Sequence, residues 1–309
     1  MKTGIFIPTY NASKDLPYFL RSLQVLNKLD RELFRVLFID SSSSDRTLEY
    51  IAQYEFNYTV IPQAEFDHGR TRQLAATLLD DCEVIIYLTQ DAELCSIESI
   101  YALTNVFRDK TIATAFGRQL PHANADIFAL ENSKFNYLYF LYVRIYEDSF
   151  LYCIKKVFSS DSFAAYRRDV LFEVGGFPEH CIVSEDMCVV AKMLILGYSL
   201  SYVSQATCFH SHNYSLLQEF GRYFDIGVFF ATHEWIKQNF GSADSEGKKS
   251  IFTLAKQVLV KEPWLLPSFC LRVFIRIISY KLGTYYKYLP IPLVKKISTQ
   301  KQYWTKLCE

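Results

Sequence analysis

The chain has 309 residues, of which 50% are apolar and 21% are charged. This composition can bury a substantial core and excludes a disordered chain. Lys plus Arg and Asp plus Glu both number 33, so no overall charge directs the protein to nucleic acid. The charge is unevenly placed: residues 251–309 hold 10 basic and 2 acidic side chains, whereas residues 1–250 hold 23 and 31. A mildly acidic body therefore precedes a strongly basic tail.

The eight cysteines include no C-x-x-C pair, and several of them stand among apolar residues. This pattern predicts reduced, buried thiols and argues against a disulfide framework or a zinc site. The first residues lack the long apolar core of a signal peptide, and no uncharged apolar stretch reaches the roughly 18 residues of a membrane span. These features predict a cytoplasmic protein.

The first 120 residues alternate between strand-like and helical patterns. Strands are predicted over 4–8, 34–39, 58–62 and 83–88, and helices over 15–29, 45–51 and 71–79. This order predicts a mostly parallel sheet that is covered by helices on both faces. Ligands of such sheets bind beyond the carboxyl ends of the strands, where Thr9, Asp40 and Asp91 stand in this sequence.

The next third of the chain is less regular. Strands are predicted over 158–167, 199–203 and 207–210, and helices over 168–174 and 184–196. Ser184 is a suitable N-cap for the second helix, and Glu185 and Asp186 suit the positive end of its dipole. A polar, Gly- and Ser-containing stretch over 241–250 predicts a linker to the basic tail.

The glycine-rich phosphate-binding motifs G-x-G-x-x-G and G-x-x-x-x-G-K-[ST] are missing, so a nucleotide would have to be bound by side chains. Other short motifs carry a family resemblance: Ile7-Pro8-Thr9-Tyr10-Asn11, Ile39-Asp40 followed by Ser41 to Thr47, Leu88-Thr89-Gln90-Asp91-Ala92, Gly175-Gly176-Phe177-Pro178-Glu179, Ser184-Glu185-Asp186 and His210-Ser211-His212. In this order and spacing the chain resembles the inverting family 2 glycosyltransferases, over nearly its whole length. It is most similar to the bacterial rhamnosyltransferases, through Phe66 to Arg72, Leu88 to Ala92, Phe158 to Ser162 and Lys281-Leu282-Gly283.

The resemblance implies an α/β protein of the GT-A fold, which is a Rossmann-like mixed sheet for nucleotide-diphospho-sugars, with a C-terminal helical extension. Residues 1–240 would form the catalytic domain, with a nucleotide-sugar-binding half over 1–120 and an acceptor half over 121–240. The linker over 241–250 and the basic, aromatic tail over 251–309 would follow.

The resemblance also implies a donor site. It would be built from Pro8, Thr9, Tyr10, Asp40, Arg72, Gln90 and Asp91. The Asp40 carboxylate can accept a hydrogen bond from a pyrimidine N–H, which suits a dTDP- or UDP-linked donor; the alternative is that Asp40 caps the next turn. The Arg72 guanidinium suits a diphosphate, with His68 and Arg70 as weaker candidates; the alternative is a surface arginine.

Asp91 is the predicted metal ligand. The family pattern has D-x-D here, whereas this chain has Thr89-Gln90-Asp91, which lacks the first acid. One aspartate can suffice for Mg²⁺ or Mn²⁺ when diphosphate oxygens and water complete the shell. His210 or His212 would be a further ligand, and an imidazole favours Mn²⁺; the alternative is two ordinary polar histidines.

Asp186 is implied as the general base that takes the proton of the acceptor hydroxyl, with Glu185 as its structural or acceptor-binding partner. Two acids that merely stabilise the helix dipole are the alternative. Asp161, Gly176 and Phe177 are assigned to the sugar or acceptor, although Asp161 could equally end a strand and the glycine turn could be purely geometric.

The tail mixes aromatic and basic residues around Trp264, Arg272, Arg276 and Lys295. Such helices suit a membrane interface, and the tail's apolar content argues against nucleic acid. The alternative is a helical subdomain that packs on the catalytic core or forms a homodimer.

These expectations define a membrane-peripheral enzyme at the inner face of the cytoplasmic membrane. It would move a sugar, L-rhamnose from dTDP-rhamnose, to a hydroxyl of a bacterial surface polysaccharide or a lipid-linked acceptor. Alternatives are a UDP-sugar-dependent family 2 transferase, a sugar nucleotidyltransferase, and a non-catalytic glycan-binding scaffold with a degenerate site. The nucleotidyltransferase is disfavoured because residues 7–12 contain no glycine or lysine.

Overall fold

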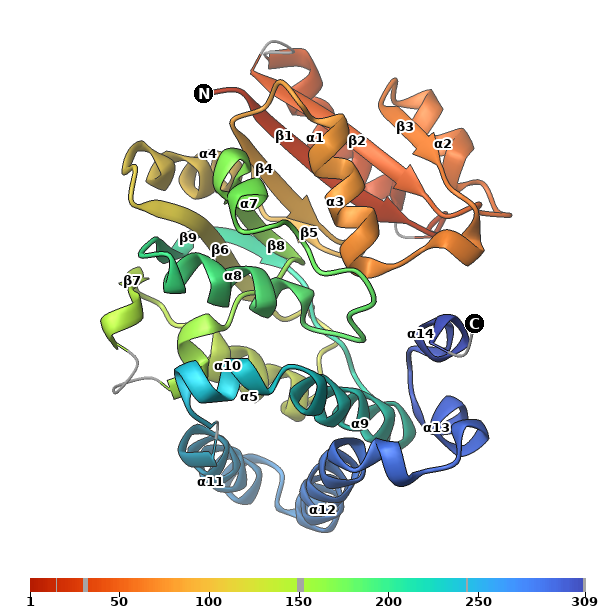
Figure 1. The fold of residues 1–309 in the computed structure, drawn as a ribbon, viewed down its shortest axis with the longest axis vertical. Helices are drawn as coiled ribbons and strands as arrows, with labels where there is room; N and C mark the ends of the chain where they lie inside the picture. Colours follow the sequence, from red (N-terminus) through yellow and green to blue (C-terminus); the bar gives the residue numbers. More distant parts are fainter. Residues whose placement is uncertain (15, 30–32, 149–152, 243, 308–309) are drawn as a thin grey trace.

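The computed structural model describes residues 1–14, 16–29, 33–148, 153–242 and 244–307, whose strands form one nine-stranded sheet (Figure 1). The strands are β1 (Thr3–Thr9), β2 (Phe34–Asp40), β3 (Asn57–Val60), β4 (Val84–Leu88), β5 (Glu93–Leu94), β6 (Ile112–Leu120), β7 (Tyr142–Arg144), β8 (Phe163–Arg167) and β9 (Ser199–Phe209). Among the described residues of the first 240, the helices are α1 (Leu16–Leu29), α2 (Thr47–Gln53), α3 (His68–Leu78), α4 (Glu98–Asn105), α5 (Ile127–Asn136), α7 (Arg168–Glu173), α8 (Glu185–Ile195), α9 (Leu216–Thr232) and α10 (Glu234–Phe240). The tail contains α11 (Asp244–Lys261), α12 (Leu266–Thr284), α13 (Ile291–Ile297) and α14 (Lys301–Lys306). Short 3₁₀ turns lie at Gln63–Glu65, Val106–Arg108, Tyr146–Asp148, Cys153–Val157, Pro263–Leu265 and Tyr286–Tyr288.

The sheet has a parallel half and a mixed half. Strands β3, β2, β1 and β4 are parallel neighbours, as the sequence predicts. Strand β8 then runs antiparallel between β4 and β6, β9 pairs in parallel with β6, and β5 and β7 pair antiparallel with β9. The parallel pairing predicted from the first 120 residues is therefore confirmed, and the sheet as a whole is mixed, as the resemblance implies.

Alternating apolar residues bury both faces of the sheet. In β1, Phe6 belongs to the core on one face, whereas Ile5 and Ile7 belong to the core on the other. This period of two follows from strand geometry, and it requires helices on both sides. Figure 1 shows α3, α7 and α8 on the near face. Residues of α1, α2 and α4 pack on the other face, which is the doubly covered arrangement that the sequence predicts.

Three predicted elements differ from the structure. The strand predicted over 158–167 begins only at Phe163, because the preceding residues form a turn. The two strands predicted over 199–203 and 207–210 are one strand, β9, whose pairing with β6 shifts register between Gly117 and Arg118. Ser184 stands at the N-cap of α8, but it has a left-handed backbone with φ of 61° and its side chain makes no capping hydrogen bond.

The predicted linker over 241–250 is wrong for most of its length, because α11 begins at Asp244. The tail is also firmly packed on the rest of the protein, because its helix α12 lies against helix α9. A Cβ on Gly227 would come within 2.2 Å of the Tyr280 carbonyl oxygen, and one on Gly283 within 2.1 Å of the Phe224 carbonyl oxygen. The two helix backbones touch here because neither glycine carries a side chain.

The basic residues of α12 that the sequence suggested for a membrane face point inward instead. Arg272 and Arg276 both pair with Glu219 of α9, whose side chain is only 3% exposed. The end of the tail then returns to the catalytic half: the Lys306 Nζ donates to the Phe66 carbonyl at 3.0 Å, and Trp304 is fully buried. The tail is thus a subdomain that packs on the core, which was the alternative interpretation. Among the described residues, no helix combines the length and the apolar character that crossing a bilayer requires.

Candidate active site

The carboxyl ends of β1 and β2 meet at one edge of the sheet, and Asp40 is buried there. Its carboxylate accepts hydrogen bonds from the Thr9 hydroxyl at 2.9 Å and from the backbone N–H of Ser43 at 2.7 Å. The Ser43 hydroxyl donates a third at 2.6 Å. Asp40 therefore holds the turn after β2, as its alternative interpretation predicted, and its contact with a nucleotide stays a prediction.

Tyr10 and Gln90 join the ends of β1 and β4. The Tyr10 N–H donates to the Gln90 side-chain oxygen at 2.8 Å, and the Gln90 amide donates back to the Tyr10 carbonyl at 3.4 Å. The Tyr10 ring is 41% exposed at this edge, where an aromatic face can stack on a base.

The predicted metal ligands come together. Ligand atoms of Asp91, His210 and His212 all lie within 4.8 Å of one another. The His210 Nε2 is 3.7 Å from the Asp91 carboxylate, and the His212 Nε2 is 3.6 Å from it. The two Nε2 atoms are 3.1 Å apart. Three potential ligands thus point at a common position, which the interpretation as two ordinary polar histidines does not explain.

The protonation states in this cluster suit a cation. Burial lowers the pKa of His210 to about 4, and burial also lowers the pKa of His212. Both imidazoles are therefore neutral at pH 7 and offer lone pairs. Burial alone would raise the pKa of Asp91, but the neighbouring His210 and the Thr89 hydroxyl outweigh it and the pKa is lowered. The cluster is one carboxylate with two neutral nitrogens, a donor set that fits Mn²⁺.

A second cluster centres on Arg72 of α3, which is only 7% exposed. Its Nε lies 2.8 Å from the Asp161 carboxylate, and its Nη1 lies 2.7 Å from the Glu185 carboxylate. The Tyr166 hydroxyl donates to Asp161 at 2.6 Å. The expectation that Arg72 pairs with a diphosphate therefore needs correction, because burial beside two carboxylates already engages its guanidinium. The neighbouring Arg70 is exposed, whereas His68 lines a cavity described below.

Asp186 lies on the same cluster. The Met187 N–H donates to its carboxylate at 2.7 Å, and the Asp161 N–H approaches it at 3.4 Å. Burial raises the pKa of Asp186 well above its ordinary value, and the charges of Asp161 and Glu185 raise it further. Burial likewise raises the pKa of Asp161 to about 6. A carboxylate with a raised pKa is a stronger proton acceptor, as a general base requires.

Glu185 differs from its neighbour Asp186. Burial would raise its pKa, but the Arg72 guanidinium outweighs burial and the pKa of Glu185 is lowered. Glu185 is therefore a fixed anion that holds Arg72, consistent with the structural role expected for it. Ser184, which directly precedes Glu185, has a left-handed backbone conformation. This conformation sets the direction in which α8 begins, and so the positions of Glu185 and Asp186.

The turn before β8 joins the two clusters. The Ser162 hydroxyl lies 3.4 Å from the His210 Nε2, whereas Asp161, its neighbour, pairs with Arg72. Gln119 strengthens this link, because its side chain contacts the His210 Nδ1 at 2.9 Å and donates to the Ser160 hydroxyl at 2.8 Å. Asp91 and Asp186 are therefore parts of one connected polar site, whereas Asp40 lies in a separate hydrogen-bonded turn.

Gly176 and Phe177 have a geometric role. Gly176 has φ of 71°, and a Cβ there would lie 2.2 Å from the Gln73 side-chain oxygen. Phe177 is only 3% exposed, and its ring packs against Tyr87 and Tyr166. The expectation that Phe177 contacts a sugar or acceptor is wrong, because the ring belongs to the core.

Several residues near the Asp91 cluster were missed by sequence reasoning. A cavity of about 580 Å³ adjoins His212 and is lined by His122, Asn124, Tyr214 and Gln218, among others. The Arg222 guanidinium lies 5.5 Å from the centre of the Tyr214 ring. Tyr214 and Arg222 follow the His210-Ser211-His212 motif closely, and that proximity was the available signal. His122 and Gln119 are distant in sequence and gave none.

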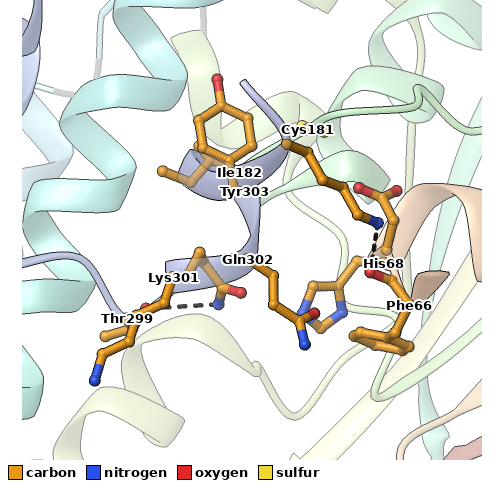
Figure 2. Close-up of a pocket in the computed structure, with 11 residues that line it drawn as sticks. Phe66, His68, Cys181, Ile182, Thr299, Lys301, Gln302 and Tyr303 are labelled. Atoms are coloured by element: carbon orange, nitrogen blue, oxygen red, sulfur yellow. Dashed lines mark hydrogen bonds between the residues drawn. The ribbon is translucent and has the colours of Figure 1, made fainter. Parts of the chain in front are cut away.

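A further cavity, of about 250 Å³, lies between the start of α3 and the end of the tail. Figure 2 shows His68 and Phe66 on one side of it and Lys301, Gln302 and Tyr303 on the other. The tail therefore lines one side of this cavity. His68 links the cavity to the Arg72 cluster, because its Nδ1 lies 3.4 Å from the Arg72 guanidinium.

Comparison with known proteins identifies the family. The sequence pattern of glycosyl transferase family 2 matches residues 4–175. The chain belongs to glycosyl transferase family 2. It is 40% identical over 309 residues to the O-antigen chain rhamnosyltransferase RfbN of Salmonella typhimurium, covering 99% of this chain and 97% of that protein. It is 37% identical over 303 residues to the O-antigen chain rhamnosyltransferase WbaN of Salmonella anatum, covering 98% and 96%.

Several solved structures share the fold. A mannosyltransferase of Pyrobaculum calidifontis, in complex with GDP-Man and Mn²⁺, aligns with a TM-score of 0.56 at 15% identity, over 99% of this chain and 86% of that one. TarS of S. aureus in complex with UDP-GlcNAc aligns with a TM-score of 0.54 at 14% identity, over 93% and 91%. The predicted GT-A fold with a C-terminal helical region is confirmed, as are the family and the resemblance to bacterial rhamnosyltransferases.

Proposed function

We propose that this family 2 glycosyltransferase moves L-rhamnose from a nucleotide diphosphate donor, dTDP-rhamnose, to a hydroxyl of a bacterial surface polysaccharide. Two near-full-length relatives bear the name O-antigen chain rhamnosyltransferase, which supports both the sugar and the acceptor. The observation that carries the catalytic part is the connection of the Asp91 cluster to Asp186 through residues 160–162.

Asp91, His210 and His212 would hold a divalent cation, for which their converging oxygen and nitrogen atoms are suited. When bound, such an ion offsets the negative charge that develops on a leaving diphosphate. The exposed Tyr10 ring at the strand edge would stack on the base of the donor, and Gln90 would hold Tyr10 in place. Arg222, whose guanidinium lies 5.5 Å from the centre of the Tyr214 ring, would add positive charge near the same phosphates.

Asp186 would take the proton from the acceptor hydroxyl while that oxygen attacks the anomeric carbon. Inversion requires the attack to come from the side opposite the leaving diphosphate, so base and metal must stand on opposite sides of the sugar. Asp161 contacts Asp186 and its neighbour Ser162 contacts His210, so the turn over these two residues would stand between the base and the metal. Arg72 would act as a positioning residue that keeps Asp161 and Glu185 ionised beside the base.

The tail would dock on the inner face of the membrane, where a lipid-linked acceptor is presented. The side of α12 that faces away from Glu219 exposes Leu271, Phe274 and Ile277, with exposed fractions of 45%, 60% and 49%. Residues spaced by three on one helix lie near one another, and such an exposed apolar face suits a membrane interface. Co-sedimentation with anionic vesicles tests this part, with Phe274→Ser as the variant expected to bind less.

A donor screen by nucleotide release tests the proposal. We expect turnover with dTDP-rhamnose and an O-antigen oligosaccharide acceptor, in the presence of Mn²⁺. Turnover with a UDP-hexose and none with dTDP-rhamnose would contradict the proposed donor and favour the alternative, a UDP-sugar-dependent transferase. Calorimetry measures the binding of dTDP and UDP, with and without Mn²⁺. It distinguishes an enzyme from a non-catalytic scaffold, because a scaffold would bind neither nucleotide.

A further inference from the structure

A second group of metal-ligating side chains lies away from the Asp91 cluster. Ligand atoms of Cys181, Cys188 and His233 all lie within 4.8 Å of one another. Cys181 stands in the turn before α8, Cys188 lies on α8, and His233 lies at the junction of α9 and α10. The two cysteines are only 3% and 1% exposed. Folding therefore brings together two thiols and an imidazole from three segments, in a buried place that the site described above does not use.

The Nδ1 side of the imidazole in this group is held by neighbouring groups. The Thr232 hydroxyl lies 2.9 Å and the Phe229 carbonyl oxygen 3.2 Å from the His233 Nδ1, and the ring stacks on that of Phe229 with centroids 4.7 Å apart. When Nδ1–H donates to a carbonyl, the lone pair of the neutral ring is left on Nε2, the nitrogen able to bind a metal. Outer contacts of this kind accompany nearly all metal-bound histidines.

Cys181 and Cys188 are both free thiols in the structure. A simple disulfide between the two cysteines would leave His233 without a role, whereas a soft divalent cation uses all three groups.

We propose that Cys181, Cys188 and His233 bind a thiophilic divalent cation, Zn²⁺, at a structural site distinct from the Asp91 cluster. Water would complete the four ligands that Zn²⁺ usually takes, and Cys181 lines the cavity of about 250 Å³ in Figure 2. The sequence argued against a zinc site, because it contains no C-x-x-C pair. The proposed ligands are separated by 7 and 45 residues, a spacing that forms no recognisable zinc motif.

The ion would fix the position of the catalytic acids. Cys181 lies four residues before Glu185, and Cys188 lies two residues after Asp186. Zinc would therefore tie both flanks of the acid pair to the α9–α10 junction. This role is independent of the sugar that the enzyme transfers, so it stands or falls separately from the proposed function.

Metal analysis of the purified full-length protein tests the site. We expect about one Zn²⁺ per chain after purification without chelator. Replacement by Co²⁺ should give thiolate-to-cobalt charge-transfer absorption in the near ultraviolet, which a site of oxygen and nitrogen ligands such as the Asp91 cluster cannot produce. The band should be lost in Cys181→Ser and Cys188→Ser. It should persist in Asp91→Asn and in the matched control Cys208→Ser, which alters a buried cysteine outside the group.

A mercurial reagent provides a second measurement on the unaltered protein, in case the serine variants fail to fold. It should release zinc only when the buried Cys181 and Cys188 react, after the exposed Cys95 and Cys270. The proposal is overturned if the wild-type protein gives no thiolate–cobalt band, or if the band survives both serine substitutions. It is equally overturned if alkylation of the denatured, unreduced protein shows Cys181 and Cys188 joined in a disulfide.

Discussion

The two polar clusters of the active site balance their charges in opposite ways. The cluster around Arg72 is buried and contains its own cation, which pairs with Asp161 and Glu185. The cluster around Asp91 has one carboxylate and two neutral imidazoles, and Asp91 and His212 remain 38% and 41% exposed. A buried group of acids is stable only with an internal counter-charge, whereas a partly open one can take its cation from solution. The first cluster is therefore a permanent part of the fold, and the second is prepared for a ligand.

The largest effect is expected on turnover, when the general base of the buried cluster is removed. Asp186→Asn keeps the shape of the side chain but removes the proton acceptor, so turnover should fall by about 10²–10⁴-fold. Nucleotide release with saturating donor measures the loss. Asp80→Asn, which changes an exposed aspartate, is the matched control. Near-normal turnover of Asp186→Asn would remove this residue from the base role.

Removal of the internal cation should destabilise the buried cluster and with it the folded protein. Arg72→Met leaves Asp161 and Glu185 buried without a counter-charge, which should lower the free energy of unfolding by about 3–5 kcal/mol. Urea denaturation measures the change. Arg46→Met, which removes an exposed pair with Glu49, should leave stability nearly unchanged. Equal stability of the two variants would contradict the structural role of Arg72.

The open cluster should respond in metal affinity and not in stability. Asp91→Asn should weaken Mn²⁺ binding by at least the ~10–100-fold that outer-shell substitutions typically cost. Calorimetry in the presence of dTDP measures the affinity, and Glu93→Gln, an exposed acid two residues away, serves as control. Full activity after thorough chelation, together with unchanged Mn²⁺ binding by Asp91→Asn, would exclude Asp91 as a ligand.

The smallest effect is the dependence of rate on pH. Asp186 must be ionised to accept a proton, and burial raises its pKa. The rate should therefore fall as pH is lowered through that raised pKa, by about tenfold per pH unit. Circular dichroism over the same range controls for unfolding. A rate that stays constant down to the ordinary pKa of an aspartate, 3.8, would show that the base is not buried in the way described.

Local patterns predicted much of this molecule. The strand ends that carry Asp40 and Asp91, and the helix start that carries Asp186, follow from apolar periodicity and from family motifs. The convergence of Asp91 with His210 and His212 also agrees with what the motifs imply. The strand ends and the helix start depend on residues that are close in sequence. Asp91 and His210 are 119 residues apart, and their convergence was implied only by the family resemblance.

The remaining features depend on contacts between distant residues. Arg72 has a partner 89 residues away and another 113 residues away, so its burial could not be predicted from its own surroundings. The inward direction of Arg272 and Arg276 depends on Glu219, and on two glycines that let α9 and α12 touch. The left-handed Ser184 is likewise a product of the surrounding structure, since serine at such a position predicts an ordinary cap.

The position of Trp304 has a consequence for how the protein is made. This side chain is fully buried in the main core, together with residues of α3 and α8 that are translated far earlier. While a ribosome is still synthesising the tail, that core lacks one of its largest members and the walls of the cavity in Figure 2. Nascent chains should therefore depend on chaperones until residue 304 has left the exit tunnel, and products of early termination should be removed by proteases.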